Sequence, residues 1–327
     1  MTADQAIAAF HPELLPEVLG VWNAALGDRF PLSRDLFMQN AILDPHFDPQ
    51  GFWVARAPNE ETVIGICLAK IAREPLAADG YLPDRGWISL LAVHPASQRR
   101  GVGRALLRQA ERYLRAHRRR RAVLGGDPDH FVPGIPRAPG ALAFFAACGY
   151  ELAGDAYDLR RPIAGYETPA SVAATMAAHP DLEIRPLGTD EASRLLAFLD
   201  EVFPGRWRYT VGRFLDLGGS IADIMGIVQG GRVCGFAHLF HPASRWIGPS
   251  IAWTHGAARR AGGIGPMGLA PALRGRGLGL ALLDRAVRRL ADLGIEDVTV
   301  DWTNLVAFYG RLGFAPWRQY RHGEKPL

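Results

Sequence analysis

Apolar positions along the chain follow two alternating patterns. Stretches with apolar residues three to four positions apart predict amphipathic helices, and short, dense apolar runs predict buried strands. In the first half this predicts helices at 12–26, 33–43, 104–118 and 141–148 and strands at 51–57, 62–72, 87–93 and 122–124. In the second half it predicts a strand from 182, strands at 221–229, 232–239, 264–269 and 297–300, and helices at 191–203, 211–217, 280–293 and 305–312. The two halves therefore share one order of elements.

Matching residues within this order indicate a tandem duplication. Gly101 and Gly103 match Gly277 and Gly279 at an offset of 176 residues. An internal repeat of this kind indicates the overall architecture, so we consider it before any local feature. We expect an α/β (α+β) fold made of two copies, each with a mixed central sheet flanked by helices. The predicted domains are 1–165 and 182–327, joined by a Pro/Ala-rich linker at 166–181 in which residues 171–178 form a turn or two of helix.

Composition supports two folded domains and excludes several classes. The 327 residues are 48% hydrophobic and 21% charged, which is typical of globular chains and sufficient for two cores. No uncharged apolar run reaches the roughly 18 residues of a membrane span, and no secretory signal is visible at the start. We therefore expect a cytoplasmic protein, monomeric or homodimeric. The three cysteines are scattered and the ten histidines show no ligand spacing, so neither a disulfide nor a metal site is expected.

The charge of the chain is carried almost entirely by arginine. The formal net charge is +4, and Lys70 and Lys325 are the only lysines. The run of four arginines at 118–121 is expected to close the helix that begins at 104, where cations complement the helix dipole. Most of the arginines are expected on solvated helix faces. No extended basic stripe is present, so no nucleic-acid partner is expected.

Two loops rich in glycine and arginine have the composition of an anion site. Residues 98–103 read Gln-Arg-Arg-Gly-Val-Gly, and residues 274–279 read Arg-Gly-Arg-Gly-Leu-Gly. Each lies between a predicted strand and a long amphipathic helix, whose first N–H groups lack partners within the helix. A nucleotide P-loop needs Gly-Lys, which is absent. Leu106 and Leu282 replace the third glycine of a dinucleotide fingerprint. A pyrophosphate-binding loop of another kind is indicated.

At these loops the chain resembles the GNAT family of acyl-CoA-dependent N-acyltransferases. The resemblance rests on both loops and on the segment from Asn304 through Ala307-Phe308-Tyr309 to Gly313-Phe314. It implies sheets whose fourth and fifth strands splay apart to admit pantetheine, with acetyl-CoA as co-substrate. In the second half it implies coenzyme A binding by Met267, Leu269, Arg274, Gly275, Arg276, Gly277, Leu278, Gly279 and Asn304. In the first half the corresponding residues are Leu91, Val93, Gln98, Arg99, Arg100, Gly101, Val102, Gly103 and Arg104.

The resemblance also implies that Tyr309 protonates the departing thiolate. A tyrosine keeps its proton at neutral pH and can donate it late in acyl transfer. Asp301 and His255 are candidates to relay the proton of the acceptor amine. In the first half Phe145 replaces Tyr309, and an insert at 126–136 displaces the equivalent of Asn304. That half is either a degenerate copy or a site of changed chemistry, in which acidic or histidine side chains of the insert take part.

We therefore expect an enzyme, an N-acetyltransferase that moves an acetyl group from acetyl-CoA to a small-molecule amine and works from the second half. The acceptor is expected near residues 203–209 and 241–263, which are rich in aromatic residues and arginine. The insert and the segment 301–314 look similar to tandem acetyltransferases joined to β-N-acetylglucosaminidases, which favours an amino sugar. Two alternatives stay open: a non-catalytic acyl-CoA-binding protein, and an acyltransferase that modifies protein or RNA.

Overall fold

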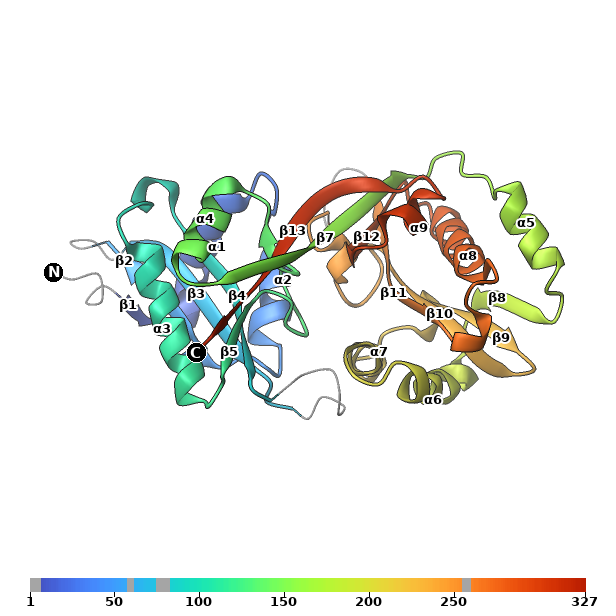
Figure 1. Cartoon of the computed structure of the whole chain (residues 1–327), viewed down its shortest axis with the longest axis horizontal. Coiled ribbons are helices and arrows are strands. Elements are labelled where there is room, and N and C mark those ends of the chain that lie inside the picture. The colour runs from blue at the N-terminus through green and yellow to red at the C-terminus, as the bar shows by residue number, and fades with distance from the viewer. Residues whose placement is uncertain (1–6, 58–61, 75–82, 255–259) are drawn as a thin grey trace. The chain divides into compact units, whose positions relative to one another are not determined.

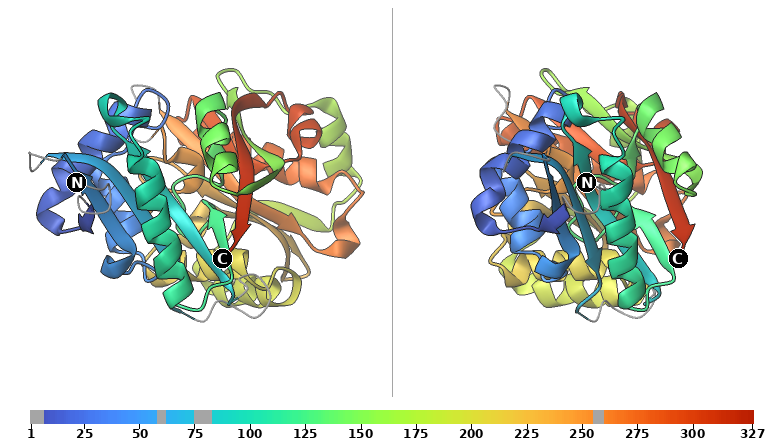
Figure 2. Two further views of the ribbon diagram at one scale, coloured as in Figure 1. Left: turned by 60° about the vertical axis from the view of Figure 1, so that its left-hand side comes forward. Right: turned by 90° about the vertical axis from the view of Figure 1, so that its left-hand side faces the viewer.

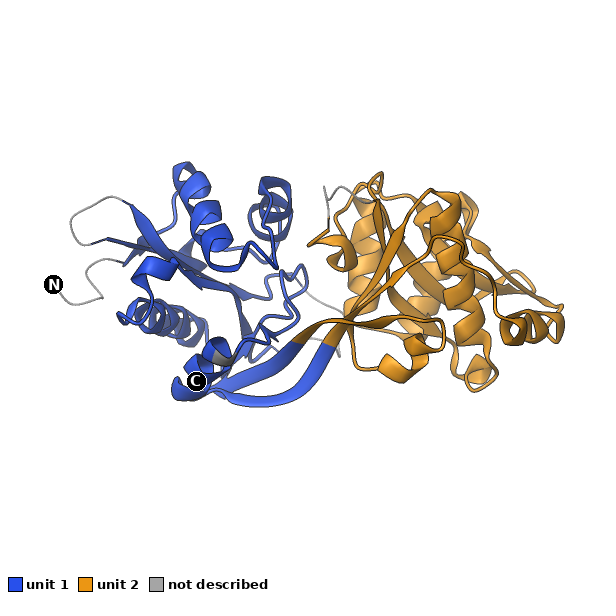
Figure 3. Ribbon diagram, turned by 90° about the horizontal axis from the view of Figure 1, so that it is seen from above, with its two compact units in different colours: residues 1–75, 82–156, 320–327 blue, residues 76–81, 157–319 orange. Residues whose placement is uncertain are grey.

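The computed structural model describes residues 7–57, 62–74, 83–254 and 260–327. These residues form two compact units, which we call the first and the second unit (Figure 3). Among the described residues, the first unit comprises those up to 156 together with 320–327, and the second unit comprises 157–319. No helix in these ranges is both long and apolar enough to cross a membrane.

The first unit is a mixed sheet with helices on both faces (Figure 1). Its strands are β1 (Ile7–Ala9), β2 (Phe52–Arg56), β3 (Val63–Ile71), β4 (Arg85–Val93), β5 (Arg121–Leu124) and β6 (Ile135–Pro136). Its helices are α1 (Leu15–Leu26), α2 (Arg34–Phe37), which widens into a π-type turn at Met38–Ile42, α3 (Val102–Ala116) and α4 (Pro139–Ala147). Strands β1 to β4 are antiparallel neighbours, and β5 runs parallel to β4. Helix α3 crosses one face of these strands (Figure 2), and its residues Leu106, Ala110 and Leu114 join Cys67 and Ile88 in a buried cluster.

The second unit repeats this plan. Its strands are β8 (Leu182–Pro186), β9 (Ile224–Gln229), β10 (Arg232–Phe240), β11 (Ala261–Leu269) and β12 (Asp297–Thr303). Its helices are α5 (Ala170–Ala177), α6 (Ala192–Val202), α7 (Arg206–Asp216), α8 (Leu278–Asp292) and α9 (Val306–Gly310). Nearly all the repeated elements that the apolar pattern predicts are present, within a few residues of the expected ends.

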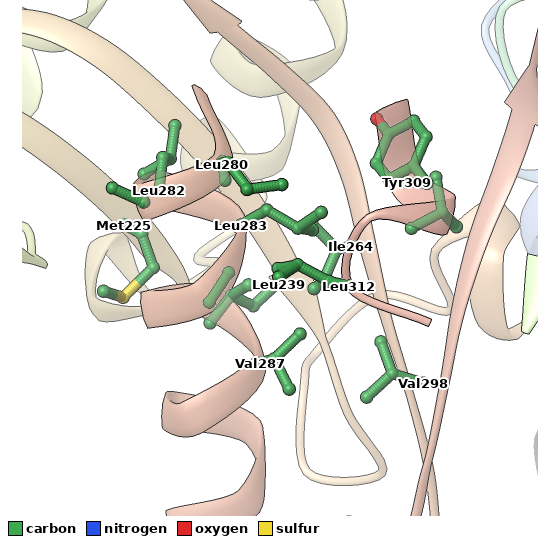
Figure 4. Packing of buried hydrophobic residues seen from close by; sticks show 14 of the residues in the cluster. Met225, Leu239, Ile264, Leu280, Leu282, Leu283, Val287, Val298, Tyr309 and Leu312 are labelled. Atoms are coloured by element: carbon green, nitrogen blue, oxygen red, sulfur yellow. The ribbon is translucent and has the colours of Figure 1, made fainter. Parts of the chain in front are cut away.

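Helix α8 supplies the main core of the second unit, because its apolar residues recur on one face. Leu280, Leu283 and Val287 are fully or almost fully buried and pack against strand residues such as Leu239 and Ile264 (Figure 4). Burying one such side chain contributes about 1.5–3 kcal/mol. A second cluster on the opposite face of the sheet joins α6 and α7 to β9 and β10.

The expected linker is part of the second unit. Helix α5 falls where one or two helical turns are predicted and packs on α8. The Tyr166 hydroxyl donates to Asp284 Oδ1 at 2.7 Å, and Asp284 on α8 is fully buried. The segment thus covers the outer side of α8 and does more than join two domains.

Two long strands that the apolar pattern does not predict complete the sheets. They are β7 (Glu151–Pro162) and β13 (Ala315–Pro326). In the second unit Asp297–Val300 of β12 pair with 159–162 of β7, and in the first unit Arg121–Val123 of β5 pair with 324–326 of β13. Both strands change unit along their length (Figure 3). Each half of the chain therefore contributes one strand segment to the other half's unit, and the compact units cross the expected boundaries at 165 and 182.

The four-arginine run does not close a helix, contrary to expectation. Helix α3 ends at Ala116, and Arg121 already begins β5. Arg118 has a positive φ of 58°, so the chain turns there instead of continuing the helix.

Candidate active site

In each unit the two parallel strands separate after a short paired stretch. In the second unit β11 pairs with β12 from Ala261 to Gly263, and both strands then continue, to Leu269 and Thr303. In the first unit β4 pairs with β5 from Arg85 to Ile88, and β4 continues to Val93. The two strands thus diverge and leave a wedge between them. On the β11 side of the wedge in the second unit, Met267 is half-buried and Leu269 is buried. Main-chain groups of β11 beyond Gly263 are not used for pairing with β12.

Two β-bulges flank the wedge of the second unit. On β11, Gly265 and Pro266 together oppose His238 of β10. On β12, Asp301 and Trp302 together oppose a single residue of β7, and Trp302 has a positive φ of 44°. Bulges turn side chains away from the regular alternation, and they are common beside active sites. An added Cβ on Gly265 would lie 3.2 Å from Asp301 Oδ1, so the two bulges bring this carboxyl against β11.

The glycine loop of the second unit is tied to the end of β11. Arg274 Nε donates to the main-chain oxygen of Leu269 at 3.1 Å. Gly275 and Gly277 have φ of 74° and 79°, and α8 begins directly afterwards at Leu278. These backbone angles favour glycine, because a side chain is strained there. Of the other predicted residues, Arg276 is exposed and Gly279 is half-buried, and Asn304, directly after β12, is exposed.

The first unit builds the same loop from different residues. Gln98 Nε2 donates to the main-chain oxygen of Val93 at 3.0 Å, as Arg274 does to Leu269. Arg99 and Gly101 have φ of 63° and 85°, which match Gly275 and Gly277 at the offset of 176. Arg99, Arg100 and Arg104 are exposed, and Val102 and Gly103 open α3. The predicted correspondence of the loops therefore extends to their backbone conformation.

Tyr309 and Asp301 are the ionisable groups near this wedge that sequence reasoning singled out. Tyr309 on α9 is 6% exposed and packs beside Leu312 and Phe314, with its hydroxyl directed away from Val298 (Figure 4). Burial, and then the charge of Asp301, raises the pKa of Tyr309. Burial, and then the charge of Asp158, raises the pKa of Asp301 to about 7. At neutral pH the tyrosine holds its proton, while the carboxyl is near its midpoint.

His255, the other candidate for the amine proton, lies outside the described residues. Of the expected acceptor segment 203–209, Phe203 and Trp207 pack with Phe236 in the core between α6, α7 and β10. Arg206 instead places its guanidinium over the Trp302 ring at 4.5 Å. Within the described ranges no group of three or more metal-ligating side chains occurs.

The first unit has different residues at the corresponding positions. At the offset of 176, Gly125 replaces Asp301 and Gly126 replaces Trp302, and both glycines have positive φ. Phe145 on α4 occupies the place of Tyr309. A pocket of about 340 Å³ is nevertheless present, lined by residues such as Leu91, Leu124 and Phe145. This unit keeps a wedge and a loop but has neither the carboxyl nor the hydroxyl at these positions.

The insert at 126–136 is buried, not solvated. Asp127, Asp129 and His130 are 0%, 9% and 5% exposed. Lys70 Nζ lies 2.6 Å from Asp127 Oδ2 and 2.6 Å from Asp44 Oδ2, and it donates to the main-chain oxygen of Asp129 at 3.2 Å. Burial alone would lower the pKa of Lys70, but the two carboxylates raise it. Asp127 is therefore part of a buried ion pair that holds the insert in place. Sequence reasoning missed this role because Lys70 and Asp127 are 57 positions apart.

Comparison with known proteins identifies the family. The model of the acetyltransferase (GNAT) family matches residues 19–133 and 195–314. The chain belongs to this family. It is an acetyltransferase, and enzymes of this family use acetyl-CoA as co-substrate. Both matched regions contain one of the glycine loops, so the predicted tandem arrangement is confirmed.

Among individual relatives, the chain is 32% identical over 325 residues to a mycothiol acetyltransferase of Salinispora tropica, covering 92% of this chain and 91% of that protein. It is also similar to a GCN5-related glucosamine N-acetyltransferase region of a fungal multi-domain GH3 β-N-acetylglucosaminidase, with a TM-score of 0.87 and 26% identity. That match covers 97% of this chain and 38% of the fungal chain. A tandem GNAT protein from the clavulanic acid pathway shares the fold, with a TM-score of 0.64, 17% identity and 98% of each chain covered.

Proposed function

We propose that the second unit transfers the acetyl group of acetyl-CoA to the amine of a small-molecule acceptor that contains an amino sugar. The observation that carries this assignment is the pair formed by Tyr309 and Asp301 at the wedge of that unit. A small-molecule acceptor is supported by the mycothiol acetyltransferase relative, and an amino sugar by the relative named a glucosamine N-acetyltransferase region.

Coenzyme A would bind along the wedge and at the start of α8. Its pantetheine arm would pair with main-chain groups of Met267 to Leu269, as an added strand does. Its pyrophosphate would accept hydrogen bonds from N–H groups of Gly275 to Gly279, where the helix dipole favours negative charge. Asn304, exposed directly after β12, is available to the pantetheine amides.

The two ionisable groups divide the proton transfers between them. The acceptor ammonium gives a proton to the Asp301 carboxylate, and the amine nitrogen then attacks the thioester carbonyl carbon. The tetrahedral intermediate collapses with cleavage of the carbon–sulfur bond, and the leaving thiolate takes the Tyr309 hydroxyl proton. The second proton of the amine nitrogen, lost as the amide forms, restores the Tyr309 hydroxyl by way of solvent, and Asp301 returns its proton to solvent. A carboxyl whose pKa is about 7 is suited to the first transfer at neutral pH. The products are the N-acetylated acceptor and the free thiol of coenzyme A.

The first unit would bind coenzyme A without turning it over. Its loop repeats the backbone angles and the strand tie of the second unit, through Gln98, Arg99 and Gly101. Phe145 and Gly125 offer no group that can exchange a proton. Leu91 lines the pocket of this unit, next to where pantetheine would pass.

An acceptor screen that follows thiol release from acetyl-CoA tests the proposal. Glucosamine and glycosides of glucosamine should be acetylated, whereas the matching N-acetylglucosamine compounds, which lack the free amine, should not react. Polyamines, a lysine-containing peptide and a free amino acid serve as acceptors of other classes. Turnover confined to one of these other classes would overturn the amino-sugar assignment. Thiol release with no amine acceptor at all would overturn the transfer reaction itself.

A further inference from the structure

The exchanged strand β7 brings a second carboxylate to the site of the second unit. Leu159 pairs with Val300 and Tyr157 with Thr303, so Asp158 alone faces the two bulged residues of β12. The Trp302 N–H donates to Asp158 Oδ1 at 3.3 Å, and Asp158 is 4% exposed. The bulge therefore rests on a buried carboxylate that comes from the other half of the chain.

Four elements surround the Asp301 carboxyl, and each contributes one group. Strand β7 supplies Asp158, whose charge raises the pKa of Asp301, and α7 supplies Arg206, whose charge lowers it. Helix α9 supplies Tyr309, and β11 supplies the main chain at Gly265. Asp158 is the nearby negative charge among these groups. Without it, burial would still raise the pKa of Asp301, and a backbone hydrogen bond and the charge of Arg206 would lower it.

The first unit offers a comparison within the same chain. Continuing the register in which Glu324 of β13 pairs with Val123 of β5, His322 occupies the position that corresponds to Asp158, and its ring lies beside Pro133 and Gly134 of the insert. Desolvation lowers the pKa of His322, which favours its neutral form. The carboxylate at this position of the exchanged strand thus occurs only in the unit that also carries Asp301 and Tyr309.

We propose that Asp158 is a positioning residue for acetyl transfer: it holds the bulge at Trp302 in place and keeps Asp301 ready to take up the acceptor proton. The proposal rests on the proposed function, in which Asp301 accepts that proton. Asp158 itself exchanges no proton during the reaction. The proton passes from the ammonium nitrogen to an Asp301 oxygen, and Asp158 acts through the backbone and through its charge.

The replacement Asp158→Asn separates charge from hydrogen bonding, because the amide oxygen still accepts from Trp302. The acidic limb of kcat/KM should move to lower pH by about 1 unit, since a like charge has been removed. The plateau of kcat should fall several-fold, because a weaker base takes up the proton less readily. The affinity for coenzyme A should not change. The matched control is Asp155→Asn, a carboxylate on the same strand that pairs with Arg321 at 3.2 Å in the first unit and should leave the limb in place.

Other variants distinguish failure of this inference from failure of the proposed function. If Asp301→Asn keeps the wild-type profile, Asp301 is not the base and the proposed mechanism is wrong. If Asp301→Asn removes the limb but Asp158→Asn leaves it unmoved, only the role of Asp158 is wrong. Should Asp158→Asn melt early, Asp158→Ser supplies a smaller uncharged acceptor for Trp302. In Asp158→Ser, a shift of the acidic limb of kcat/KM to lower pH supports the positioning role of Asp158, and an unchanged limb overturns it.

Discussion

Replacing Lys70 by methionine removes the single cation that joins three segments of the first unit. The Lys70 side chain is fully buried, and its nitrogen lies 2.6 Å from one oxygen of Asp44 and 2.6 Å from one of Asp127. It also donates to the main-chain oxygen of Asn40 at 2.5 Å. The two carboxylate oxygens are therefore within about 5 Å of each other, and in the variant they would face one another without the ammonium. Removing one partner of a buried ion pair costs about 3–5 kcal/mol, and we expect Lys70→Met to lie in that range.

The loss should depend on pH in a defined direction. Burial alone would raise the pKa of Asp127, but Lys70 holds it below its ordinary value. The ion pair therefore contributes stability above the unfolded pKa of about 3.9, and this contribution is lost as pH falls through the lower folded value. In Lys70→Met the carboxylates can take up protons in the folded state, so the deficit should shrink as the pH is lowered from 7 toward 4.

Urea unfolding of the full chain at several pH values measures the effect. The fluorescence of Trp22, Trp53 and Trp87, all buried in the first unit, contributes to the signal. The control is Arg121→Met, which breaks an ion pair with Glu324 in the same unit whose two side chains are 44% and 36% exposed, and it should cost no more than about 1 kcal/mol. A loss below about 1 kcal/mol for Lys70→Met, or a deficit that grows as the pH falls, would refute the reasoning.

Three further outcomes are expected. Tyr309→Phe should lower kcat by about 10²-fold with unchanged coenzyme A affinity, while Phe145→Tyr in the first unit changes little; full activity of Tyr309→Phe at saturating acetyl-CoA would contradict the assignment. Gly277→Val combined with Gly279→Val should abolish coenzyme A binding in calorimetry when the first loop is disabled by Gly101→Val. A side chain is strained at the positive φ of Gly277 and Gly101, a Cβ on Gly277 would meet Thr175, and a side chain at Gly279 would obstruct the start of α8; wild-type affinity would show that the loops do not hold the pyrophosphate. Removing residues 320–327 should eliminate the unfolding transition of the first unit in scanning calorimetry, since β5 loses its neighbour; two unchanged transitions would contradict the importance of that pairing.

Local patterns in the sequence predicted the repeated elements well, because each has a long apolar face or a dense apolar run. The loops before α3 and α8 were also predictable, since glycine and arginine between a strand and a helix have few other uses. Strands β7 and β13 were not predicted, because much of each is exposed or half-buried and the segments carry many charged residues. Their pairing is decided by partners more than a hundred positions away.

The candidate site, like the fold, could be predicted from the sequence only in part. Asp301 lies near the end of one predicted strand and Tyr309 on the next predicted helix, so sequence reasoning could name both as candidates. Asp158 precedes Trp302 by 144 positions, and no local pattern connects them. The burial of the insert was also not predictable. It depends on the ion pairs of Lys70, and a charged residue inside a predicted strand does not indicate which carboxylates will pair with it.

The exchange of strands has a consequence for how this chain can change over evolutionary time. In the proposed function the first half does not turn coenzyme A over, and a duplicated copy without that role would ordinarily be free to accumulate deletions or to be discarded. Here the first half carries Tyr157 to Pro162, the strand segment beside Asp301, so its loss would remove an edge of the working sheet. Selection on the second unit would therefore also act on the first half, because neither unit is complete without a strand segment from the other half of the chain.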